Sequence, residues 1–219
     1  MEQIDTAFLA RFFQAAAARL EAERDALCSL DGAIGDGDHG ISMANGFAAV
    51  AALVRGRQSS QDDPAQLMRA AAAAFLGEVG ATVGPLYATG MLDAADLFDA
   101  RGPIPLEQAH LFLAALASGI ARRGQAEPGD KTMLDAWLPA VQTAETAAHA
   151  GHPPADALWS AVDAARKGAT ATATMVASRG RAKRLQARSL GHRDPGAVSA
   201  TLILEALAQT AGTAPARPD

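Results

Sequence analysis

Eight stretches of this chain carry apolar residues at every third or fourth position, and turns rich in Gly, Pro or Asp separate them. That spacing puts apolar side chains on one face of an α-helix, and no strand pattern has a partner elsewhere in the sequence. Asp5, Asp63 and Asp130 stand where three of these helices need N-caps. We therefore predict an all-α fold with helices over about 6–27, 43–56, 63–76, 86–98, 105–122, 130–150, 155–178 and 195–210.

Composition supports one helical domain over residues 1–210. Aromatic residues make up only 5% of the chain and alanine is abundant, which favours closely packed helices over a β-sandwich. The Pro/Ala-rich end, 211–219, has no apolar pattern and is expected to be a flexible tail. No apolar run approaches the roughly 18 residues that span a bilayer, and the start lacks a signal-peptide pattern. We expect a cytoplasmic protein with no membrane partner.

Charge and cysteine content narrow the function further. The formal net charge is -5, which argues against nucleic acid as the main partner, although the run 179–184 is locally basic. The one cysteine, Cys28, has no internal disulfide partner and suits a reducing compartment. On its helical stretch it is expected to be a buried apolar residue.

Turn composition predicts where a site lies. Short connections make neighbouring helices antiparallel, so alternate turns meet at the same end. The first, third, fifth and seventh turns, near residues 36, 82, 129 and 194, are the four rich in Gly and Asp. We therefore predict an antiparallel eight-helix barrel or bundle with these four loops gathered at one end.

The first of these loops carries three carboxylates, Asp31, Asp36 and Asp38, among several glycines. Like charges held this close cost free energy unless a cation relieves them. Oxygen ligands with room for water suit Mg²⁺, which usually binds a few carboxylates together with substrate phosphates. The loop thus predicts a magnesium site and a phosphate-bearing ligand, with Ser42 and Asn45 on the following helix facing that ligand.

The sequence does not match three other motifs that bind phosphate or metal. An EF-hand counted from Asp36 needs Gly at its sixth place and Glu at its twelfth, where this chain has Ile41 and Phe47. The run from Gly35 to Gly40 formally matches a dinucleotide fingerprint, but it follows a helix where that motif needs a strand. No Gly-Lys-Ser/Thr sequence is present, which excludes a P-loop.

Three segments together resemble the L subunit of dihydroxyacetone kinase. They are LDGAIGDGDHG at 30–40, GDKTM at 129–133 and SLGHRDPGA at 189–197. The similarity spans nearly the whole chain. It implies an antiparallel eight-helix barrel that holds ADP or ATP at one end through two Mg²⁺ ions. A hydroxyketone bound to a partner K subunit would accept the γ-phosphoryl group.

The resemblance also assigns residues. It implies that Asp31, Asp36 and Asp38 are the metal ligands and that they act with Arg181 in catalysis. Nucleotide contacts would come from His39, Gly40, Ile41, Ser42, Thr82, Val83, Gly124, Met133, Arg181, Asp194, Pro195 and Gly196. Free-standing L subunits of this size resemble the phosphotransferase-system type, in which a phosphohistidine-carrying M subunit recharges bound ADP.

One departure and several alternatives remain. Where the family usually has Ala-Ser-Gly-Pro, this chain has Thr82-Val83-Gly84-Pro85, so a hydroxyl expected at 83 is missing and Thr82 is the candidate replacement. A subunit of an ATP-exchanging dihydroxyacetone or tetrulose kinase would carry the same motifs. A Mg²⁺-dependent helical hydrolase and a metal-stabilised interaction module are the rivals from other classes. A homodimer is left open.

Overall fold

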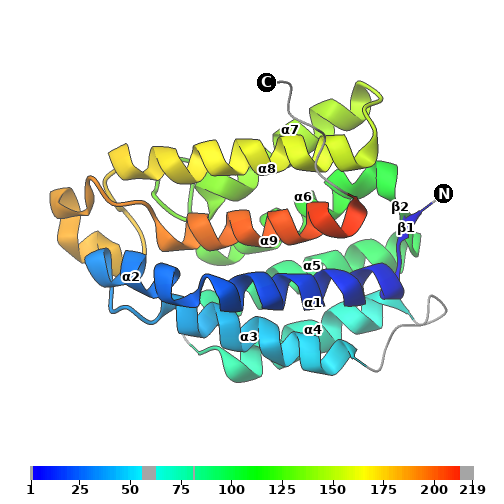
Figure 1. The fold of residues 1–219 in the computed structure, drawn as a ribbon, viewed down its shortest axis with the longest axis horizontal. Coiled ribbons are helices and arrows are strands. Elements are labelled where there is room, and N and C mark those ends of the chain that lie inside the picture. Colours follow the sequence, from blue (N-terminus) through cyan, green and yellow to red (C-terminus); the bar gives the residue numbers. More distant parts are fainter. Residues whose placement is uncertain (1, 56–62, 81, 213–219) are drawn as a thin grey trace.

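The computed structural model describes residues 2–55, 63–80 and 82–212, without the side chains of Arg181 and Leu185. These residues form helices almost throughout (Figure 1). The α-helices are α1 Thr6–Ala22, α2 Arg24–Ile34, α3 His39–Val54, α4 Pro64–Glu78, α5 Val83–Arg101, α6 Ala109–Gly124, α7 Leu134–His149, α8 Pro154–Ala171 and α9 Pro195–Ala211. Short 3-10 helices are η1 Leu106–Gln108, η2 Thr172–Thr174 and η3 Arg181–Ser189.

The long helices close into a ring. Each packs against the next along the chain, in the order α1, α3, α4, α5, α6, α7, α8 and α9, and α9 returns to pack against α1. The ring has eight members because α2 continues the first predicted helix beyond a break at Glu23, where φ is -103° and ψ is 8°. The predicted all-α, eight-helix barrel is confirmed.

Aromatic side chains fill the barrel. Phe47 makes edge contacts with Phe75 and Tyr87, with ring centroids 5.4 and 6.0 Å apart, and Trp137 is buried in the same core. These large rings occupy the axis, while the many alanines let the helices approach around it. The core therefore holds the helices around the barrel, while the short connections between them set the end at which each loop lies.

Two contacts set the closest approaches in the wall. A Cβ on Gly119 would lie 2.7 Å from the Cα of Gly90, so glycine at both positions lets α5 and α6 touch backbone to backbone. On the other side, the buried Glu205 of α9 accepts hydrogen bonds from Arg19 of α1 at 3.1 Å and from Arg166 of α8 at 2.8 Å. This carboxylate ties α9 to both of its neighbours.

Several local expectations need correction. The sequence predicted no strand, but β1 Gln3–Ile4 pairs antiparallel with β2 Ile104–Pro105, with Ile4 opposite Ile104. Helix α8 ends at Ala171, earlier than expected, and residues 172–174 tighten into η2. The last helix continues to Ala211, and residues 213–219 of the expected tail lie outside the described part of the chain.

The helix caps expected from the sequence have mixed outcomes. Asp5 accepts a hydrogen bond from the Phe8 amide at 2.8 Å, and Asp63 accepts one from the Ala65 amide at 2.9 Å, so both N-caps are confirmed. Asp130 is not an N-cap, because α7 begins at Leu134. Among the helices of the described residues, none combines the length and apolar character that crossing a membrane requires.

Candidate functional site

The four Gly/Asp-rich loops meet at one end of the barrel, on the left in Figure 1, around a pocket of about 500 Å³. This confirms the gathering predicted from turn order. Helices α3, α5, α7 and α9 all begin at this end, and helix N-termini favour anionic groups. The predicted site residues that line the pocket are Asp31, Asp36, Asp38, His39, Ser42, Thr82, Val83, Gly124, Met133, Asp194, Pro195 and Gly196.

Three carboxylates form an acidic group at the edge of this pocket. Asp31, Asp36 and Asp38 each offer an oxygen atom, and these three atoms lie within 4.8 Å of one another. Such a spacing lets hard oxygen ligands share a divalent cation. The three side chains therefore have the chemistry and the proximity that a Mg²⁺ site needs.

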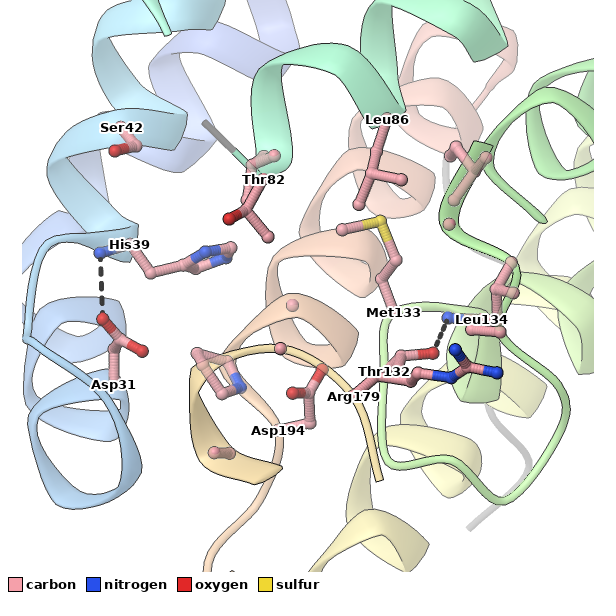
Figure 2. Close-up of a pocket in the computed structure, with 18 of the residues that line it drawn as sticks. Asp31, His39, Ser42, Thr82, Leu86, Thr132, Met133, Leu134, Arg179 and Asp194 are labelled. Atoms are coloured by element: carbon pink, nitrogen blue, oxygen red, sulfur yellow. Dashed lines mark hydrogen bonds between the residues drawn. The ribbon is translucent and has the colours of Figure 1, made fainter. Parts of the chain in front are cut away.

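Asp31 is held in position by its own loop. Its Oδ2 accepts hydrogen bonds from the backbone amides of Gly37 at 2.9 Å, Asp38 at 3.1 Å and His39 at 3.3 Å, and Figure 2 draws the last of these. A Cβ on Gly35 would lie 2.2 Å from Oδ1 of the same carboxylate, so glycine there makes room for it. Gly37 has a φ of 78°, which also favours glycine. The loop thus presents a carboxylate of fixed orientation.

His39 opens helix α3 beside the acidic group. Its Nε2 lies 2.9 Å from the Ser199 hydroxyl, which itself donates to the carbonyl of Gly196 at 3.0 Å. Burial lowers the pKa of His39 to about 4, although the charge of Asp31 opposes the shift. The imidazole is therefore neutral at physiological pH, and helix α9 fixes its position.

Loop 125–133 is organised by two residues that the sequence analysis did not place in the site. The buried Asp135 accepts hydrogen bonds from the amides of Gly129 at 2.6 Å and Thr132 at 2.8 Å. Lys131 is also buried, and its ammonium donates to the carbonyls of Thr172 at 2.6 Å and His192 at 2.5 Å. Lys131 thus joins this loop to the segment before α9.

Asp194 caps helix α9 at the base of the pocket. Its side chain accepts from the Ala197 amide at 2.7 Å, and its own amide donates to the Thr172 hydroxyl at 2.8 Å. Burial raises the pKa of Asp194 to about 7, and the nearby carboxylates of Asp135 and Asp31 add to that rise. The group is therefore poised to respond to any cation that enters the pocket.

The remaining wall of the pocket is mostly apolar. Leu86, Met133 and Leu134 line it opposite the acidic group, and Figure 2 shows Leu86 and Met133 side by side. Arg179 lies at this side and donates to Asp130 at 3.2 Å. Thr82 also lines the pocket, in a left-handed conformation with a φ of 80° that is strained for a β-branched residue. An apolar slot beside an acidic group suits a flat, polar-tailed ligand.

Four predicted residues are placed differently from the rest. Asn45, expected to face the ligand, is exposed on α3 and does not line the pocket. Ile41 is 49% exposed and does not line the pocket. Gly40 is buried against α2, where a Cβ would lie 2.0 Å from the carbonyl oxygen of Arg24, so its observed role is close helix packing. The side chain of Arg181 lies outside the described part of the chain.

A helical barrel with a carboxylate triad and four helix N-termini around one pocket has the chemistry that an anionic ligand and a divalent cation require. Comparison with protein families matches residues 33–209 to the DAK2 domain. The chain is 36% identical over 189 residues to the ADP-binding subunit DhaL of the PEP-dependent dihydroxyacetone kinase of Escherichia coli, covering 86% of this chain and 89% of that protein.

Other relatives extend the comparison. The ADP-binding subunit DhaL of PEP-dependent dihydroxyacetone kinase 2 of Listeria innocua is 34% identical, over 93% of this chain and 94% of its own length. The L-erythrulose 1-kinase of Mycolicibacterium smegmatis is 34% identical over 90% of this chain, which covers 34% of that enzyme. The chain therefore belongs to the DAK2 domain family, and within it to the DhaL-type subunits of dihydroxyacetone kinase.

A solved structure shares the fold. The dihydroxyacetone kinase of C. freundii in complex with AMP-PNP and Mg²⁺ matches with a TM-score of 0.73 and 24% identity. The match covers 95% of this chain and 35% of that one, so this chain spans about a third of that kinase.

Proposed function

We propose that this chain holds an adenine nucleotide with Mg²⁺ in the pocket and delivers the γ-phosphoryl group to a hydroxyketone carried by a partner K subunit. The observation that carries the proposal is the carboxylate triad, Asp31, Asp36 and Asp38, placed where the helix N-termini converge. Full-length similarity to ADP-binding DhaL subunits supports the nucleotide and the dihydroxyacetone substrate. Catalysis would consist of positioning and charge neutralisation.

The triad fits magnesium on its own geometry, and we propose that it binds two Mg²⁺ ions. The carboxylate of Asp31 is already oriented by three amides and given space by Gly35, so it needs little reorganisation to bind a cation. Bound metal would neutralise charge on the nucleotide phosphates. His39 would lie against the phosphates, and Leu86 and Met133 would cover the base and keep out water.

We further propose the phosphotransferase-system type of reaction, with ADP kept in place and recharged by a phosphohistidine-carrying M subunit. Similarity over nearly the full length of PEP-dependent subunits supports this type. The alternative is an ATP-exchanging kinase of the erythrulose type, since the L-erythrulose 1-kinase of Mycolicibacterium smegmatis contains a region 34% identical to this chain. Both types would use the same residues, but they differ in whether the nucleotide leaves.

Native mass spectrometry of the gently purified chain, with and without a chelator, tests the proposal. We expect ADP and two Mg²⁺ to travel with the protein and to be lost together on chelation. A chain that arrives empty and binds ATP only on addition would favour the exchanging alternative. Absence of nucleotide under every condition would refute nucleotide binding.

The Asp36→Asn substitution tests the metal site directly. Removing one charged ligand should weaken Mg²⁺ and nucleotide retention together, by at least about tenfold, while circular dichroism still shows a helical protein. Asp25→Asn is the matched control, because Asp25 is an almost fully exposed carboxylate at the other end of α2. Equal nucleotide affinity in the two variants would remove the metal-bridge argument.

A further inference from the structure

The segment between α8 and α9 carries an unusual concentration of positive charge. Residues 179–193 contain six of the chain's 19 Lys and Arg residues and no Asp or Glu, in a protein of net charge -5. Lys183 and Arg184 lie on η3 before its kink at Gln186, where φ is 48°, and Arg188 lies after that kink; all three are exposed. We call these three residues the cationic strip. Within the described residues, none of these three side chains takes part in an ion pair or a hydrogen bond.

Hydrogen bonds hold the backbone around the cationic strip in place. The buried Ser189 hydroxyl accepts from the Ala177 amide at 2.9 Å and donates to the Gln186 carbonyl at 2.7 Å, which ties the end of η3 to the segment after α8. Two residues later, the Gly191 amide donates to the Ala173 carbonyl at 2.8 Å. Buried hydrogen bonds of this kind hold a backbone in one arrangement. The charges are therefore presented from a defined position.

That position is the edge of the pocket. Gly180 and Ala182, directly before the strip, line the pocket, and η3 packs against α2, the helix that carries Asp31. Figure 1 shows η3 at the same end of the barrel as the start of α3. A macromolecule that binds the strip therefore lies beside the pocket opening, where an acceptor must approach.

We propose that the cationic strip is the docking surface for an acidic face of the protein that carries the phosphoryl acceptor, an inference that rests on the proposed function. Unpaired charges at the edge of a site steer a complementary partner and set its orientation. A nucleic acid is disfavoured as the occupant, because its phosphates would also meet the carboxylate triad and an overall negative protein. The geometry thus favours a protein with acidic groups around its substrate.

The test is a triple variant, Lys183→Gln, Arg184→Gln and Arg188→Gln, measured in phosphoryl transfer to the dihydroxyacetone-loaded K subunit of the same organism. We expect unchanged nucleotide retention, and a concentration of K subunit for half-maximal rate that rises at least about tenfold at low salt. The difference should shrink at about 0.5 M salt, where screening is strong.

The matched control removes three exposed cations from the opposite half of the molecule by Arg11→Gln, Arg55→Gln and Arg101→Gln. It makes the same change in net charge, so equal effects of the two triple variants would overturn the proposal. The proposal would also be overturned if the strip variant needed the same concentration of K subunit for half-maximal rate as the unaltered chain. Binding of duplex DNA that only the strip variant loses would overturn it as well. If the unaltered chain retains no nucleotide or transfers nothing, the proposed function fails and the docking surface with it.

Discussion

Replacing Lys131 with Met should destabilise the protein, although lysine substitutions at surfaces are usually neutral. The ammonium donates to two carbonyls, of Thr172 and His192, and the side chain is only 2% exposed. Each buried acceptor left without a donor costs about 1–3 kcal/mol. The substitution to methionine recovers part of this free energy, because burying a charged amine is itself unfavourable. Burial does lower the pKa of Lys131.

The Thr172 carbonyl keeps the Met175 amide as a donor at 3.1 Å, so the substitution orphans only the His192 carbonyl. Less that recovery, the net loss is about 1–2 kcal/mol. For a chain of this size, this corresponds to a fall in melting temperature of roughly 3–8 °C. Lys167→Met is the control, since Lys167 is exposed on α8. Thermal unfolding by circular dichroism should separate the two variants clearly. Melting temperatures within about 2 °C of each other would refute the structural role assigned to Lys131.

Three further predictions follow from the site. Gly168→Ala should destabilise the protein by about 2 kcal/mol or more, because a Cβ would lie 1.9 Å from the Asp135 carbonyl oxygen. Gly77→Ala, with open space around it, should stabilise the protein by up to about 1 kcal/mol. Urea titrations measure both changes. With chelator present, the unfolding free energy of the wild type should fall relative to that of Asp194→Asn as pH rises from about 4 to about 7. The raised pKa of Asp194 makes the folded state favour the protonated acid, so its ionisation costs stability. A difference between the two proteins that does not change with pH would contradict this. Ser199→Ala should weaken nucleotide retention and alter the ¹⁵N NMR signals that report the tautomer of the His39 imidazole. An unchanged His39 spectrum would exclude the positioning role of Ser199.

The sequence predicts the barrel well because its two determinants are local. Helical spacing and caps such as Asp5 and Asp63 define where helices begin, and the antiparallel rule then decides which loops meet. The acidic loop was also evident, since three carboxylates within eight residues are rarely needed for packing. These features require no knowledge of distant contacts.

The missed features depend on contacts between distant segments. Lys131 and Asp135 look like ordinary helix-start residues, and only the approach of residues 172 and 192 makes the lysine a buried donor. Asp130 resembled an N-cap, but it is bonded to Ser178 and Arg179 from the segment after α8. The β1–β2 pair escaped prediction because two-residue strands carry too little pattern to recognise.

The direction of the helices also governs what can be attached to this barrel. Thr6 opens α1 and Ala211 ends α9 at the end of the molecule opposite the pocket, where β1 meets β2 (Figure 1). A polypeptide joined before α1 or after α9 would leave the four loops uncovered. The same architecture can therefore work as a separate subunit or as one segment of a longer kinase, and fusing a reporter protein at either end should not interfere with access to the nucleotide.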